Sequence, residues 1–218
     1  MAVVLADNAL TTLATVEEEL GITVGGGIAD DYLNRMINVY SDFIESSLFR
    51  KLKRTAVTDE KVAGYATRYL MVERYPVDTG ETTTVKYNDD TIDSTQWEWD
   101  NDGEGGRLFN LAGVWYWGAG VANNIARDPV PGTERKRYKV SYTGGYIMPK
   151  DWNGTDAFRL PWDIEQLCIE MVATAYRHKG QSRDIKSEKL LSSSVTYFDA
   201  ADSPRWHDVM GKYRRGGI

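Results

Sequence analysis

The sequence contains very little cysteine and histidine. Of its 218 residues, one is a cysteine, Cys168, and two are histidines, His178 and His207. A single thiol excludes a disulfide framework and a multi-cysteine metal site. The two histidines lie far apart in the sequence and offer little material for a histidine-based active site. This inventory points away from an enzyme, so we predict no catalytic residue, no bound metal and no cofactor.

Long apolar runs and an excess of positive charge are also missing. The longest uncharged stretch, residues 108–126, is interrupted by glycines and asparagines, which are poor choices in hydrocarbon. The formal charge of −6 argues against a protein that coats nucleic acid non-specifically. No basic segment precedes the short apolar run at the start, so no signal peptide is predicted. We expect no membrane partner.

What is present suffices for a folded core. Hydrophobic residues make up 42% of the chain and charged residues 27%, a composition that excludes a disordered protein. The length fits one domain, or one domain that carries a large insertion.

The first part of the chain has helical periodicity. Thr15 and Glu18 have the spacing of a capping box, and Gly21 predicts the end of a short helix. Asp30 is the expected cap of a longer helix. In that helix, apolar residues recur at three- and four-residue steps to about Phe49, which predicts one apolar face.

Helical periodicity returns in the last third. Pro161 suits the first position of a helix because its missing amide would be unused there, and Gly180 predicts the end. Ser203-Pro204 predicts the start of a short last helix, and residues 195–198 predict a short strand.

The middle of the chain has strand periodicity instead. Large apolar residues alternate with polar ones at 82–87, 96–100 and 137–142, and a shorter strand is expected at 69–72. We therefore predict an α+β fold. Residues 1–50 and 160–218 form a helical bundle core, and residues 51–159 form a β-rich antiparallel insertion.

Three short motifs suggest chemistry, and a structural interpretation is favoured for each. The acidic turn at 100–104 resembles part of a calcium loop, but Phe109 stands where the bidentate carboxylate belongs. Cys168 lies on an apolar helix face, where burial raises the pKa of a thiol and makes it inert. The basic run at 135–139 would be divided between two strand faces, which indicates a charged strand edge.

Four tryptophans in the middle of the chain leave a binding function open. Trp97, Trp99, Trp115 and Trp117 could form a carbohydrate-binding platform on the sheet. They are spaced as strand pairs, however, and aromatic packing across strands explains them without a ligand. A ligand-binding module is the alternative function.

The charges are unevenly distributed along the chain. Residues 78–104 contain nine acidic residues and one lysine, a balance of −8, whereas residues 203–218 contain four basic residues and one acidic residue, a balance of +3. A solvated turn and a frayed tail would explain this pattern. The other interpretation is a basic terminal segment that docks on an acidic partner.

Several short landmarks follow one another over most of the chain. They are Ala9–Leu13 with Val16–Gly21, Ile44–Arg50, Tyr75–Val77, Asp93–Asp100 before Gly106–Leu108, Val140–Tyr146 before Leu160–Pro161, Lys186–Lys189, Ser194–Tyr197 and Tyr213–Arg215. In this succession the sequence resembles the head–tail connector proteins, also called adaptor or head-completion proteins, of tailed double-stranded DNA phages. Many members of that family are much shorter, and residues 115–131 have no counterpart there.

The resemblance implies a structural virion protein of the neck, assembled in the cytoplasm of the bacterial host. It implies a ring of twelve copies beneath the portal protein, which extends the DNA channel and recruits the next neck or tail-completion protein. Genomic DNA would pass through without sequence-specific binding, and a negative chain suits such a channel.

In such adaptors the C-terminal segment embraces the portal, and this segment corresponds here to residues 203–218. We therefore expect portal contacts from five residues, in which arginines form charge-assisted bonds and aromatic side chains are buried anchors. They are Arg205, Trp206, Tyr213, Arg214 and Arg215. We expect this terminus to be free to bind a neighbour.

Overall fold

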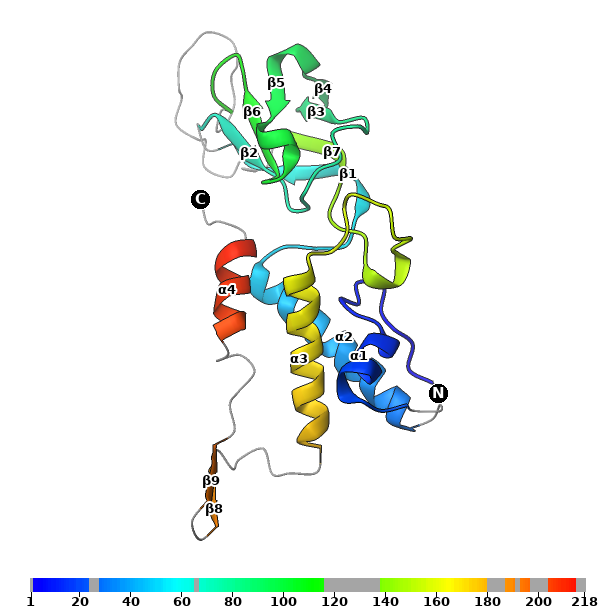
Figure 1. Ribbon diagram of the computed structural model, residues 1–218. Coiled ribbons are helices and arrows are strands. Elements are labelled where there is room, and N and C mark those ends of the chain that lie inside the picture. Colours follow the sequence, from blue (N-terminus) through cyan, green and yellow to red (C-terminus); the bar gives the residue numbers. More distant parts are fainter. Residues whose placement is uncertain are drawn as a thin grey trace. The chain divides into compact units, whose positions relative to one another are not determined.

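The computed structural model describes residues 2–23, 28–64, 67–115, 138–179, 187–190, 193–196 and 204–214. The chain divides into two compact units. One consists of Met1–Arg50 with Ile147–Ile218, and the other consists of Lys51–Tyr146 (Figure 1). Residues 147–159, which the sequence pattern assigned to the insertion, lie in the first unit. We call the first the helical unit and the second the β unit.

The helical unit begins with α1 (Leu13–Leu20), whose cap differs from the prediction. Thr12 has an extended conformation, and its hydroxyl oxygen accepts a hydrogen bond from the amide of Thr15 at 3.3 Å. The predicted cap at Thr15 is therefore wrong, since Thr15 already lies inside the helix. The predicted end is confirmed, because Gly21 follows the helix with a left-handed φ of 63°.

The long helix α2 (Ile28–Leu48) ends where the periodicity predicts, but it begins earlier. Asp30 is therefore not its cap. Asp30 and Asp31 lie in the first turn, where negative charge favours the helix dipole. In the last third of the chain, α3 (Trp162–Arg177) starts directly after Pro161, and α4 (Pro204–Tyr213) is the predicted last helix.

The first and last thirds of the chain meet where α2 packs on α3. Leu33, Ile37, Ile44 and Leu48 are fully buried on α2, as is Ile164 on α3. Between the helices, Ser41 Oγ lies 3.8 Å from Cys168 Sγ. The expected burial of Cys168 is confirmed, and it raises the pKa of the thiol to about 12.

The residues before α1 run along α2 and bind its side chains. Asp31 and Asn38 accept hydrogen bonds from the backbone amides of Val3 and Ala6 at 2.7 and 2.8 Å. One turn further on, Ser41 accepts a hydrogen bond from the amide of Leu10 at 3.0 Å. These side chains lie on one face of α2 because they recur at steps of three and seven residues.

The described residues of the β unit form two antiparallel sheets. The first has the strand order β1-β7-β3-β4 and the second has the order β2-β6-β5. Their bounds are β1 Thr55–Val62, β2 Tyr69–Met71, β3 Thr84–Tyr87, β4 Asp90–Thr91, β5 Trp97–Trp99, β6 Arg107–Asn110 and β7 Tyr138–Gly144, with 3-10 turns at Ser94–Gln96 and Asp100–Gly103. The three strands that alternation predicted are present as β3, β5 and β7, and the shorter strand expected at 69–72 is β2.

One hydrophobic cluster forms the core of the β unit. On β7, buried and half-buried residues alternate from Tyr138 to Gly144, so that one face of the sheet turns inward. The buried members of the cluster are Val62, Leu70, Val72, Tyr75, Val77, Val85, Trp97, Leu108, Trp115, Tyr138, Val140 and Tyr142.

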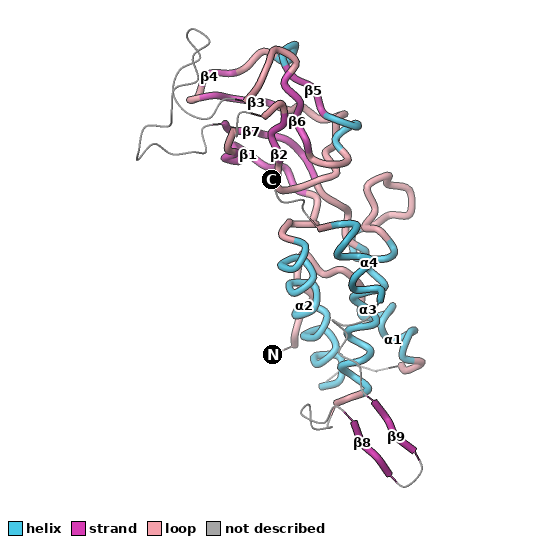
Figure 2. Tube along the Cα trace, turned by 90° about the vertical axis from the view of Figure 1, so that its left-hand side faces the viewer, coloured by secondary structure: helices cyan, strands magenta, loops and turns pink. Residues whose placement is uncertain are grey.

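Two further elements complete the described structure. A 3-10 turn at Pro149–Asp151 precedes α3, and β8 (Ser187–Leu190) pairs with β9 (Ser193–Thr196) as a separate hairpin. Figure 2 shows the helices and strands by type. The predicted α+β fold, with a helical core from both ends of the chain and an antiparallel β-rich middle, is confirmed. None of the helices in the described residues has the length and apolar character that a membrane crossing requires.

Gly145, at the end of β7, should be intolerant of any side chain. Its φ is +103°, and an added Cβ would lie 2.7 Å from the carbonyl oxygens of both Leu52 and Lys53. We expect Gly145→Ala to destabilise the β unit by about 2–4 kcal/mol, because backbone strain and overpacking add. Gly113→Ala is the control for space alone, since Gly113 also has a positive φ, +159°, but no atom lies within 4 Å of its added Cβ. Denaturant titration that finds equal losses for both variants would refute this account.

Candidate interaction surface

The terminal helix α4 packs on its own subunit through one buried apolar residue. Pro204 is its first residue, a position where a missing amide is harmless. Val209 is 1% exposed, and it is the one described residue of α4 that is buried. The neighbours of α4 are α3 and α2. The remainder of the contact is made by polar and aromatic side chains at the edges of the helix.

Two acidic residues of α3 bind the two ends of α4. Glu170 Oε1 forms an ion pair with Arg205 Nε, 2.9 Å away, near the start of α4. Near its end, Asp163 accepts a hydrogen bond from Lys212 Nζ at 3.0 Å. The hydroxyl of Tyr213 also donates to both carboxylate oxygens of Asp163, at 2.8 and 2.9 Å. Because Asp163 and Glu170 are seven residues apart, they lie on one face of α3, two turns from each other.

Two aromatic residues, Phe43 on α2 and Phe49 directly after it, contact the other side of α4 and the residue that follows α4. Trp206 stacks on Phe43, with ring centroids 5.2 Å apart and an interplanar angle of 19°. The guanidinium of Arg214 lies over the ring of Phe49, 4.7 Å from its centroid. Such cation–π contacts contribute about 0.5–1 kcal/mol at exposed sites.

Four of the five predicted portal-contact residues are therefore brought together, three on α4 and Arg214 directly after it. Arg205 and Tyr213 contact α3, Trp206 contacts α2, and Arg214 contacts Phe49, the residue after α2. Arg215 lies outside the described residues. The expectation that this terminus is free is wrong for α4, because its charges and rings find partners within the subunit. The role of these residues in portal binding stays a prediction.

An open hollow of 420 Å³ lies between α3 and α4. It is lined by Asp163, Arg205, Asp208, Val209 and Lys212, so both signs of charge surround one apolar side chain. Among the described residues, no group of three or more histidine, cysteine or acidic side chains is placed to hold a metal ion.

Asp163 should make the contact between α3 and α4 sensitive to acid. Burial alone would raise its pKa, but hydrogen bonds from Lys212 and Tyr213 outweigh burial and lower the pKa below its ordinary value. Because the pKa is lowered, the stabilisation that ionised Asp163 gives to the α3–α4 contact is complete above the ordinary aspartate pKa of about 3.9. This stabilisation is lost as pH falls through the lowered pKa. We expect Asp163→Asn at pH 7 to lower the hydrogen-exchange protection factors of α4, a loss of protection that the wild type undergoes only in acid. Unchanged exchange in residues 204–214 of the variant would contradict this role.

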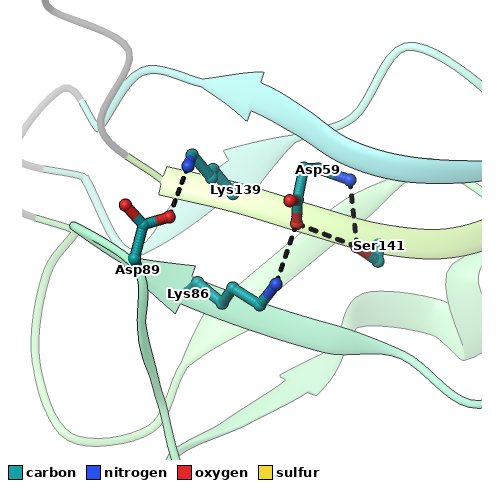
Figure 3. A network of polar contacts seen from close by, with 5 residues as sticks. All are labelled: Asp59, Lys86, Asp89, Lys139 and Ser141. Carbon is teal, nitrogen blue, oxygen red and sulfur yellow. Dashed lines mark hydrogen bonds and ion pairs between the residues drawn. The ribbon is translucent and has the colours of Figure 1, made fainter.

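A second group of charges lies on the outer face of the four-stranded sheet (Figure 3). Lys86 on β3 and Lys139 on β7 are directly opposite each other, and like charges at such positions are destabilising. Asp59 accepts a hydrogen bond from Lys86 at 3.2 Å, and Asp89 pairs with Lys139. The hydrogen bond from Lys86 lowers the pKa of Asp59, and the one to Asp89 raises the pKa of Lys139. Each lysine is thus neutralised locally.

The tryptophans of the middle segment are mainly structural. Trp97 and Trp115 are 9% and 1% exposed, and the indole of Trp115 donates to the carbonyl oxygen of Leu108 at 3.0 Å. Trp99 is half-buried and donates to Thr83 Oγ1 at 3.2 Å. Trp117 lies outside the described residues. Trp97 and Trp115 therefore have no free ring face for a sugar.

Sequence reasoning missed the residues that receive α4. The periodicity of α2 placed Phe43 on the apolar face, where core packing is expected, but Phe43 is 42% exposed and contacts α4 instead. Asp163 and Glu170 lie on α3 outside its apolar periodicity, which gave no indication of a partner. The seven-residue spacing of Asp163 and Glu170, opposite a helix with Arg205 and Lys212 seven residues apart, is a signal that could have found the pair.

Comparison with known proteins identifies solved structures with a similar fold. No protein-family model and no curated protein matches the chain. Among solved structures, a chain in the neck of an empty gene transfer agent particle has a TM-score of 0.50 and 15% sequence identity. That match covers 100% of this chain and 96% of the other. Chains from the native virion and from the native neck have TM-scores of 0.46 and 0.45 with 14% identity, at the same coverage.

The likeness therefore extends over the whole chain, with both the helical core and the β-rich middle included. The resemblance to head–tail connector proteins is confirmed at the level of the fold: this chain has the fold of a chain in the neck of a gene transfer agent particle.

Proposed function

We propose that this chain is a structural protein of the neck of a phage-like particle, where it joins the head to the tail. The observation that carries the proposal is the fold shared with a neck chain over 100% of this sequence. The order of sequence landmarks supports it independently, because it indicated the same kind of protein. In this role the chain forms a ring of twelve copies beneath the portal, extends the DNA channel and recruits the next neck protein.

The portal contact in this proposal is α4 with the residues that follow it. Residues 203–218 have a net charge of +3 in a chain of −6, so this segment suits an acidic partner. The hollow beside α4 is lined by cationic Arg205 and Lys212 together with Asp163 and Asp208, whereas Val209 is buried. Together these features fit a docking segment better than a frayed tail.

The contacts of α4 within its own subunit leave room for a partner. Arg205 and Lys212 have side chains that are 45% and 65% exposed although each forms an ion pair. An arginine has five N–H donors, and the ion pair with Glu170 is made by the Nε of Arg205. The same side chains can therefore hold α4 in place and bind carboxylates of the portal.

In a DNA channel, the lining contributed by this chain must not bind the phosphates of the DNA backbone. A formal charge of −6 suits that role, because a basic lining would hold the DNA backbone. Assembly of the ring would occur in the cytoplasm of the bacterial host, before the tail is attached.

Reconstitution of head–tail joining tests the proposal. Particles made without this chain should accumulate as filled heads and separate tails. Purified full-length chain added to such heads should bind them and restore joined particles. Heads that join tails equally well without the chain would refute the neck function.

A further inference from the structure

The last helix is basic in the sequence, but its charge is balanced once the subunit has folded. Among the described residues 204–214, three side chains are cationic, and they are Arg205, Lys212 and Arg214. Three carboxylates lie on α4 or bind it from α3, and they are Asp208, Asp163 and Glu170. We call these six residues the α3–α4 charge cluster. Its formal charge is zero.

The carboxylates of the cluster are placed among the cations. Glu170 binds Arg205 at 2.9 Å, and Asp163 binds Lys212 at 3.0 Å. Asp208 lies three residues after Arg205 and four before Lys212, so it shares their face of α4 and lines the same hollow. Each of these two cations therefore has one carboxylate in direct contact and another within one helical turn.

The described charged residues beside the cluster do not change this balance. Exposed Asp42 on α2 and exposed Arg177 on α3 contribute one charge of each sign. Arg159 and Glu165, near the start of α3, bind each other. His207 on α4 counts as neutral at pH 7. The surface around the described part of α4 therefore has no excess of positive charge.

A balanced surface treats DNA and a protein partner differently. Binding to the DNA backbone depends on net positive charge, which releases the counterions of the phosphates. A carboxylate of a protein is instead bound at short range, through hydrogen bonds of defined geometry. Arg205 remains 45% exposed and contacts Glu170 through Nε, so its terminal nitrogens still offer donors to such a carboxylate.

We propose that Asp163, Glu170 and Asp208 determine the specificity of this surface by excluding DNA from α4. Their carboxylates repel phosphate, whereas the donors of α4 still bind a protein partner through short-range contacts. Like charges that reject a wrong partner are a general means of specificity. This inference rests on the proposed neck function, in which the portal is the correct partner and the genomic DNA is the competing one.

Neutralisation of two of these carboxylates tests the exclusion. Asp208→Asn and Glu170→Gln are combined in the full-length chain, while Asp163 is kept because it holds both Lys212 and Tyr213. Binding to a short labelled DNA duplex is measured by fluorescence anisotropy at several salt concentrations.

The matched control neutralises two acidic residues of the β unit. Asp90→Asn and Glu98→Gln change the net charge of the chain by the same amount, and both side chains are exposed. Asp208→Asn alone is a second comparison, because it removes a carboxylate from α4 itself and leaves the ion pairs with α3 in place.

The cluster variant should bind the duplex at low salt at least about tenfold more tightly than the wild type or the control, since juxtaposed like charges are removed. If Arg205, Lys212 and Arg214 each contact one phosphate, affinity should fall about 40-fold when the salt concentration is raised fourfold. Asp208→Asn alone should give an intermediate gain. Addition of Arg205→Gln to the cluster variant should reverse most of the gain, because it removes one of the three cations.

Three results would overturn the inference. DNA binding by the control as tight as that of the cluster variant would show that the net charge of the chain decides. A cluster variant that binds DNA no better than the wild type would show that these carboxylates exclude nothing. A gain in the cluster variant but none from Asp208→Asn alone would show that release of α4 from α3 exposes the cations. All three leave the neck function standing, because that function fails only if heads join tails without this chain.

Discussion

Deletion of residues 203–218 is expected to abolish the joining of heads to tails while leaving the rest of the chain folded. The deletion removes α4, which contributes one buried side chain, Val209, to the helical unit. The α2–α3 contact between Ser41 and Cys168 includes no residue of α4. Loss of a single interface hot spot costs 2 kcal/mol or more, so binding to heads should fall at least about 30-fold. Binding is measured by co-sedimentation of the purified chain with portal-bearing heads, and folding by circular dichroism.

Point variants separate portal contacts from contacts within the subunit. Arg205→Gln removes an arginine that binds Glu170 and that we propose also binds the portal. Glu170→Gln breaks the same ion pair without changing α4. We expect Arg205→Gln to weaken binding to heads and Glu170→Gln to leave it intact or strengthen it. Equal losses for both variants would mean that Arg205 acts only by holding α4 in place, and a truncated chain that still binds heads would remove α4 from the portal contact altogether.

Replacement of Trp115 by alanine is expected to destabilise the β unit by about 3–5 kcal/mol, the usual loss for a large aromatic core residue. The Trp115 ring is 1% exposed and meets Tyr138 edge-to-face, with centroids 5.2 Å apart. Removing it leaves a cavity and an unpaired carbonyl oxygen at Leu108. Hydrogen exchange in peptides from β1 and β7 should accelerate by about 100-fold or more, since 1.4 kcal/mol is a tenfold change in the opening equilibrium.

Trp115→Phe is the control for ring volume. It keeps most of the buried surface but loses the N–H donor to Leu108, so we expect a smaller loss of about 1–2 kcal/mol. If Trp115→Ala left exchange in the β unit unchanged, Trp115 would not be a core residue. The binding platform suggested by the tryptophan spacing would then need to be reconsidered.

The fold could be predicted from the sequence where periodicity is strong. The three- and four-residue steps on α2 and the alternation on β7 specify which faces are buried, because burial of apolar surface dominates folding. Helix starts were less predictable. At α1, both Thr12 and Thr15 are suitable caps, and the choice depends on backbone conformation before the helix.

The candidate surface could be predicted only in part. The charge and aromatic residues of α4 indicated an interaction, but their partners within the subunit lie more than 25 residues away along the chain, as Arg205 and Glu170 show. Such pairing depends on tertiary structure, which local sequence patterns do not reveal. The sequence predicted a helix start at Pro161, but the 67% exposure of Trp162 and its contact with Arg159 are evident only in the structure.

The location of this chain in intact particles tests the central claim most directly. Cryo-electron microscopy of the purified particles, with a small tag fused to the chain, should show it as a ring between the portal and the first tail protein. The account predicts twelve copies with α4 turned toward the portal. Tag density on the capsid shell or along the tail, with a neck that contains no copy of this chain, would contradict it.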